Sequence, residues 1–64
     1  MNKGDRIKKL RNELGLTLEN VADKVGTSRQ TIQRYESGEI SNIPSDKREG
    51  IAVGLKTSPA YIIG

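Results

Sequence analysis

The chain has 64 residues and a net charge of +3, and it contains neither cysteine nor histidine. A chain of this length forms one small domain with a modest apolar core, and without these two residue types it has neither a disulfide nor a Cys/His zinc site. No apolar run approaches the roughly 20 residues of a membrane span, and no apolar segment follows the charged N-terminus as in a signal peptide, so we expect a cytoplasmic protein.

The first predicted helix runs from residue 5 to residue 14. Ile7, Leu10 and Leu14 are spaced as one helical stripe, and Gly15 follows as a C-terminal stop. The basic residues of the N-terminal segment are Lys3, Arg6, Lys8, Lys9 and Arg11. Such clustering suits a polyanionic partner such as nucleic acid, although a solvated helix face is the commoner reason for it.

Two short helices and a tight turn are predicted in the middle of the chain. Thr17 is a suitable N-cap for a helix that continues to Val25, and Gly26 closes this helix in a left-handed conformation. Ser28 caps a third helix, which ends near residue 37 with Gly38 as its stop. Two short helices joined by a turn of about three residues that contains glycine form a helix-turn-helix.

A loop and two further helices are predicted in the C-terminal third. Residues 39–45 lack helical periodicity, and either Pro44 or Ser45 begins the fourth helix. The inward face of this helix would hold Ile51, Ala52 and Leu55, and its weakening residues are Gly50 and Gly54. Ser58 and Pro59 begin a short fifth helix. Its apolar face would hold Tyr61, Ile62 and Ile63. The predicted fold class is therefore all-α with five helices.

The third helix has one anchored face and one polar face. On a helical wheel Ile32 and Tyr35 lie on the anchored side, and Arg29 lies between the two faces. The opposite side carries Gln30, Gln33, Arg34 and Ser37. Arginine offers a fork of donors that matches guanine, and glutamine pairs with adenine. A solvated surface is the usual explanation for a polar face, but a helix that follows a tight glycine turn in a basic all-helical domain favours base reading in the major groove.

The segment TLENVADKVGTSRQTIQRYESG, residues 17–38, resembles the lambda-repressor-like helix-turn-helix family of phage and bacterial regulators. Ala22 matches the small residue at the helix crossing, Gly26 the turn, and Ile32 and Tyr35 the anchors. The later stretch NIPSDKREGIAVGLKTSPAYIIG resembles the last two helices of members in which this domain precedes a self-cleaving peptidase-like domain. The resemblance therefore implies one compact domain over residues 1–64, either complete or the N-terminal part of a longer repressor.

The resemblance also implies roles for the matched positions. Bases would be read by Arg29, Gln30, Gln33 and Arg34. Phosphates would be contacted by Thr17, Ser37, Ser41 and Asn42, with charge from the N-terminal lysines and Lys47. Glu36 would pair with Arg11 and tie the first helix to the third. Three positions depart from the family pattern: Leu18 replaces a phosphate-gripping polar residue, Arg48 an apolar residue and Lys56 a glycine.

The leading prediction is sequence-specific binding to double-stranded DNA as a transcriptional repressor. A homodimer would bind an inverted repeat, with the dimer surface around residues 61–63. The alternative is a protein-interaction or antitoxin-like module, because one fold serves several functions. Catalysis is not expected, since histidine and cysteine are absent and the carboxylates are scattered. No cofactor, metal or small-molecule ligand is indicated.

Overall fold

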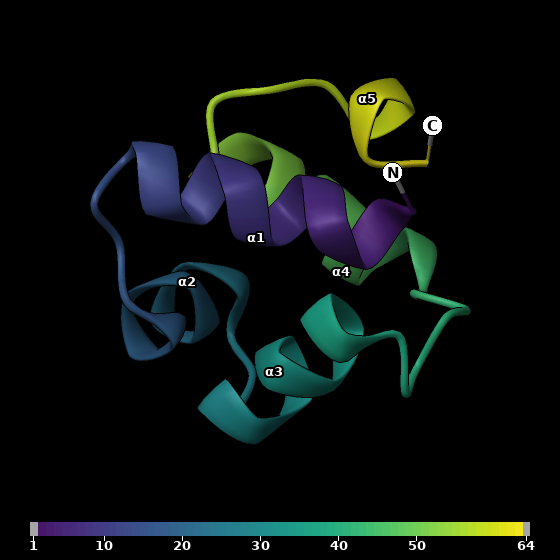
Figure 1. The fold of residues 1–64 in the computed structure, drawn as a ribbon, viewed down its shortest axis with the longest axis horizontal. Coiled ribbons are helices and arrows are strands. Elements are labelled where there is room, and N and C mark those ends of the chain that lie inside the picture. The colour runs from purple at the N-terminus through teal and green to yellow at the C-terminus, as the bar shows by residue number, and fades with distance from the viewer. Residues whose placement is uncertain (1, 64) are drawn as a thin grey trace.

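The computed structural model describes the backbone of residues 2–63 and the side chains of residues 2–62. Over this range the fold is all-helical, as predicted (Figure 1). Its elements are α1 (Lys3–Glu13), α2 (Leu18–Val25), α3 (Arg29–Ser37), α4 (Ser45–Gly54) and α5 (Pro59–Ile63). In Figure 1, α1 crosses the middle of the molecule, with α2 and α3 on one side of it and α5 on the other. None of the described helices is long and apolar enough to cross a membrane.

The first helix begins two residues earlier than the sequence prediction. Asn2 is its N-cap, and the Asn2 side chain accepts a hydrogen bond from the N–H of Asp5 at 2.9 Å. The apolar stripe predicts only the interior of a helix, whereas this cap adds a first turn made of Lys3 and Gly4. At the other end Gly15 has a φ of +69°, as suits a residue that ends a helix.

The helix-turn-helix has the predicted boundaries. Thr17 and Asn20 form a reciprocal capping box at the start of α2, in which each side chain accepts the other residue's backbone N–H. Gly26 takes the left-handed conformation at φ +81°, and the Ser28 hydroxyl then accepts the N–H of Thr31 to begin α3. Short-range hydrogen bonds and one left-handed glycine thus set the turn.

All five helices and the loop before α4 contribute to one core. The buried apolar residues are Ile7, Val21, Ala22, Ile32, Tyr35, Ile43, Ile51, Ala52, Leu55 and Ile62. Of the two loop isoleucines, Ile43 is buried and Ile40 is half-buried against the core. Gly50 and Gly54 remain within α4, where their neighbours across the helix contact are Val25 and Lys24.

The fifth helix buries one residue of the predicted dimer surface. Ile62 is fully buried in the core of its own chain, so it is not on the surface to contact a second copy. Tyr61 is half-buried, and its carbonyl accepts a hydrogen bond from Nη1 of Arg6 at 2.9 Å. The Arg6 guanidinium also lies 5.0 Å from the centre of the Tyr61 ring. The side chain of Ile63, the third residue of the predicted surface, lies outside the described residues.

Candidate nucleic-acid interface

The predicted recognition surface is the outer side of α3. Figure 1 shows this helix at the edge of the molecule, and its packing partners include α1 and α2. Ile32 is fully buried and Tyr35 is 5 % exposed, so these two side chains fix the inner side of the helix. The exposed residues include the four predicted base readers, Arg29, Gln30, Gln33 and Arg34. The structure therefore leaves the predicted base-reading side chains in solvent.

One shallow hollow lies at the N-terminal end of α3, where Arg29 and Thr17 both line it. The Thr17 hydroxyl oxygen accepts the N–H of Asn20 at 3.0 Å, which leaves the hydroxyl proton free for another acceptor. Leu18, which departs from the family pattern, packs against the core and makes no polar contact through its side chain. Any phosphate contact at this position would come from the backbone at the start of α2.

A second hollow lies at the C-terminal end of α3. Its lining residues are Asn2, Lys3, Gly4, Tyr35, Gly38 and Ser41. Ser41 and its neighbour Asn42 are exposed, as expected for residues that meet a phosphate. The sequence interpretation did not place Asn2 in this region, although an asparagine just before a helix is a recognisable N-cap signal. Lys47 is half-buried in α4 and lines neither hollow.

The Ser37 hydroxyl is engaged within the protein. It donates to the carbonyl oxygen of Arg34 at 3.2 Å and accepts the N–H of Glu39 at 3.3 Å. A serine hydroxyl has a single proton, so a phosphate contact by Ser37 would require this hydroxyl to rotate away from Arg34. Sequence periodicity places Ser37 on the outer side of the helix but does not reveal this local bond.

Arg11 and Glu36 form a nearly enclosed ion pair between α1 and α3. Arg11 Nε lies 2.6 Å from Glu36 Oε2, and Arg11 Nη2 donates to Glu36 Oε1 at 3.1 Å. Arg11 Nη1 donates to the carbonyl of Leu16 at 3.0 Å. The hydrogen bond to Glu36 raises the pKa of Arg11, which burial alone would lower. Since all three nitrogens of the guanidinium have acceptors inside the protein, Arg11 ties helices together.

The remaining basic residues near the N-terminus divide into two groups. Arg6, like Arg11, bonds within the protein, whereas Lys8 and Lys9 are exposed and Lys3 is half-buried at the second hollow. The cluster is therefore only partly a surface for a polyanion. Its arginines bond within the protein, whereas Lys8 and Lys9 face solvent.

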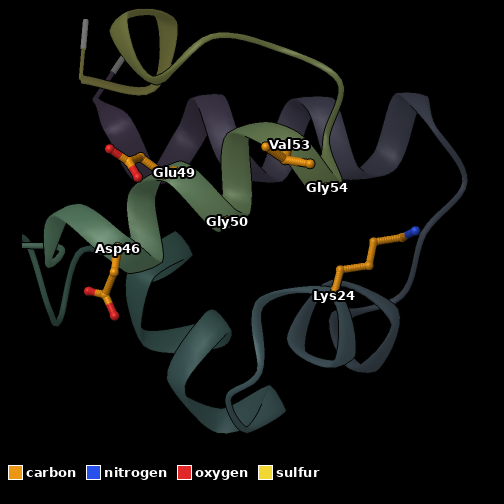
Figure 2. A pocket seen from close by; sticks show the side chains of 6 residues that line it. All are labelled: Lys24, Asp46, Glu49, Gly50, Val53 and Gly54. Atoms are coloured by element: carbon orange, nitrogen blue, oxygen red, sulfur yellow. The ribbon is translucent and has the colours of Figure 1, made fainter.

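A third hollow lies between α2 and α4 (Figure 2). Figure 2 shows Lys24 on α2 across from Asp46 and Glu49 on α4, with Val53 on the same helix. None of the residues lining this hollow comes from α3. Among the described residues no group of three or more Asp, Glu, His or Cys side chains is placed to hold a metal ion.

Two short helices, α2 and α3, are joined by a left-handed glycine. Ile32 and Tyr35 anchor the second helix, which exposes arginine and glutamine. This arrangement defines a helix-turn-helix domain of the DNA-binding class. A family model described as Helix-turn-helix matches residues 7–62, and the chain belongs to this lambda-repressor-like family. The predicted resemblance is therefore confirmed, and DNA binding is the activity that the family supports. Neither a search of curated proteins nor a search of solved structures returned a match.

Proposed function

We propose that this domain binds a specific double-stranded DNA sequence by inserting α3 into the major groove, and that it represses transcription. The observation that carries this proposal is a row of exposed arginine and glutamine side chains on a helix that has a hollow at each end. An α-helix with its side chains is roughly 10–12 Å across, which fits the width of about 12 Å of the major groove.

Four side chains are proposed to read bases. Arg29 and Gln30 begin the helix, at the end that meets the bases in this docking mode, and Gln33 and Arg34 follow one turn later. Arginine would bind guanine O6 and N7, and glutamine would bind adenine N6 and N7. The site is therefore expected to contain G·C and A·T pairs at fixed positions, in an order that depends on how α3 tilts in the groove.

Phosphates on the two sides of the groove would be held at the two hollows. At the N-terminal hollow the free proton of Thr17 and the backbone N–H groups at the start of α2 are suitable donors. At the other hollow Lys3 supplies charge and Ser41 a hydroxyl, and the exposed Asn42 follows Ser41 in the chain. Lys47 lines neither hollow. Its positive charge would therefore attract the DNA backbone from a longer distance.

A homodimer on an inverted repeat is the proposed working state in the bacterial cytoplasm. Helix-turn-helix domains bind two half-sites about 34 Å apart, so a dimer doubles the number of base contacts. Its surface is not built on Ile62, which is buried. Residues 1–64 would act as one DNA-binding domain, whether alone or at the start of a longer repressor.

Selection of binding sites from a random DNA pool tests the proposal. The expected result is an enriched inverted repeat, bound with an affinity that falls steeply between about 50 and 200 mM salt because phosphate contacts release counterions. Arg34→Ala should lower affinity for the enriched site by about 1–3 kcal/mol and relax specificity at one base pair. A pool without enrichment would contradict sequence-specific binding.

A protein-interaction module is the second candidate function. The observation that favours it is the hollow between α2 and α4, where Val53 is 79 % exposed beside three charged side chains (Figure 2). A domain of this kind would show no measurable DNA binding even at about 50 mM salt, where non-specific attraction is strong. The same binding series therefore separates the two candidates.

A further inference from the structure

Glu39, a residue without a role in the proposed interface, lies beside one of the proposed base readers. Its carboxylate oxygen Oε2 is 3.2 Å from Nε of Arg34. Both side chains are largely in solvent, at 58 % exposure for Arg34 and 67 % for Glu39. The pair therefore sits on the surface that the proposed function turns toward DNA.

The turn after α3 holds Glu39 in this place. Gly38 adopts a φ of +85°, which reverses the chain direction at the end of the helix. The N–H of Ile40 then donates to the carbonyl of Arg34 at 3.1 Å, and Ile40 packs against the core. The N–H of Glu39 itself donates to the Ser37 hydroxyl at 3.3 Å. Both neighbours and the backbone of Glu39 are thus fixed relative to Arg34.

The contact occupies only one edge of the Arg34 guanidinium. A guanidinium carries five N–H donors, and Nε supplies one of them. Among the described residues the structure gives no acceptor to Nη1 or Nη2 of Arg34. Those two nitrogens can form a bidentate pair with guanine O6 and N7. Glu39 can therefore hold the side chain from behind while the outer fork remains free for a base.

The Glu39 carboxylate also affects how Arg34 interacts with DNA phosphates, which compete with bases for the guanidinium. Without a restraint, an exposed arginine at the end of a recognition helix can turn to the nearest phosphate. Phosphate attracts arginine whatever the DNA sequence, so such a contact carries no specificity. A negative charge 3.2 Å from Nε of Arg34 attracts the guanidinium and repels phosphate. It repels the edge of a guanine much less, because O6 and N7 carry only partial negative charges whereas a phosphate carries a full one.

We propose that Glu39 is a positioning residue that determines specificity by directing Arg34 to a base and away from the phosphate backbone. This inference rests on the proposed function, because it assumes that Arg34 reads a base pair. The Arg34–Glu39 pair is exposed, and exposed ion pairs contribute only about 0–1 kcal/mol. The expected effect is therefore about a two- to fivefold change in discrimination, with binding retained.

The test compares Glu39→Gln with Glu49→Gln. Both variants remove one negative charge from an exposed glutamate, but Glu49 lies on α4 at the hollow between α2 and α4. Binding is measured to the selected site and to its three substitutions at the base pair that Arg34→Ala relaxes. Glu39→Gln should bind the substituted sites more tightly and lose about two- to fivefold discrimination at that base pair. Glu49→Gln should change affinity for all four sites by one common factor.

The double variant separates positioning from general charge repulsion. In an Arg34→Ala background, Glu39→Gln should have no further effect on discrimination at that base pair, because the side chain that Glu39 orients is gone. The inference is overturned if Glu39→Gln behaves as Glu49→Gln does, or if its effect persists without Arg34. If the wild-type protein itself selects no sequence, the proposed function fails first. That result is distinguishable from one in which the wild-type protein selects a sequence but Glu39→Gln leaves its discrimination unchanged.

Discussion

Arg11 and Glu36 form the more enclosed of the two ion pairs among the described residues, with side chains 13 % and 7 % exposed. The pair joins α1 to α3 through two hydrogen bonds, of 2.6 and 3.1 Å. Since Glu36 lies within the recognition helix, this contact fixes the orientation of that helix relative to the rest of the domain.

Arg11→Ala should lower the free energy of unfolding by about 3 kcal/mol, because it leaves the Glu36 carboxylate nearly buried without its partner. Urea denaturation measures this change, and Arg34→Ala, which removes the exposed pair, should lower it by less than about 1 kcal/mol. The raised pKa of Arg11 contributes stability that is fully present below the pKa of arginine in the unfolded chain and is lost only in strongly alkaline solution. Equal stabilities of the two variants would contradict the structural role of Arg11.

Gly4 and Gly50 should respond oppositely to the same substitution. A Cβ at Gly4 would overlap the backbone carbonyl oxygens of Tyr35 and Glu36, so Gly4→Ala should force α1 away from α3 and destabilise the fold by about 2 kcal/mol. A Cβ at Gly50 would meet Val25 at 3.6 Å, an ordinary contact. Gly50→Ala should therefore stabilise α4 by up to about 1 kcal/mol.

Thermal melts followed by circular dichroism distinguish the two glycine variants, because each is the other's control for the added methyl group. The expected order of melting temperature is Gly50→Ala, wild type, Gly4→Ala. A Gly4→Ala variant as stable as wild type would mean that the two helices can separate without loss.

Lys56 is the only described non-glycine residue with a positive φ, at +57°. This left-handed conformation follows the end of α4, and glycine adopts it without the steric cost of a Cβ. Lys56→Gly should raise the free energy of unfolding by about 0.5–1 kcal/mol, because it removes the steric strain of a Cβ while adding some freedom to the unfolded chain. Lys56→Ala removes the charge but keeps the strain, so its unfolding curve should not show the same gain.

Substitutions of Lys3 and Lys24 test whether DNA binds at the end of α3 or at the hollow between α2 and α4. Lys3 lines the hollow at the end of α3, and Lys24 lines the one between α2 and α4. Lys3→Ala should weaken binding to all sequences by a similar factor and reduce the slope of log affinity against log salt by about 1. Lys24→Ala should leave this slope unchanged. Reversed results in a salt titration would place the DNA on the other surface.

Much of the helix-turn-helix could be predicted because its signals are local. Thr17, Gly26, Ser28 and Gly38 each act within a few residues of themselves, so the boundaries of α2 and α3 agree with the prediction. The start of α1 was wrong by two residues because the apolar stripe does not include its cap, Asn2. The Asn2 cap is itself a local signal, but the prediction for this helix used only the apolar stripe.

The burial of Ile62, one residue of the predicted dimer surface, could not be predicted for a different reason. Ile62 lies near the end of the chain, and sequence position alone made it an exposed apolar residue. In the structure α5 packs against both α1 and α4, and Arg6 contacts Tyr61 across 55 positions of sequence. No periodicity within α5 contains that information, since it depends on where three separate helices meet.

The sequence by itself determined the helices, the glycine turn and the polar face of α3, since caps, periodicity and left-handed glycines operate over distances of a few residues. Only the tertiary structure decided which polar groups remain free for a partner. It placed Arg6 in a hydrogen bond to the carbonyl of Tyr61 and Arg11 in an ion pair with Glu36, and both contacts join distant parts of the chain. The physical reason is that a side chain's role depends on the acceptors and donors that folding brings to it.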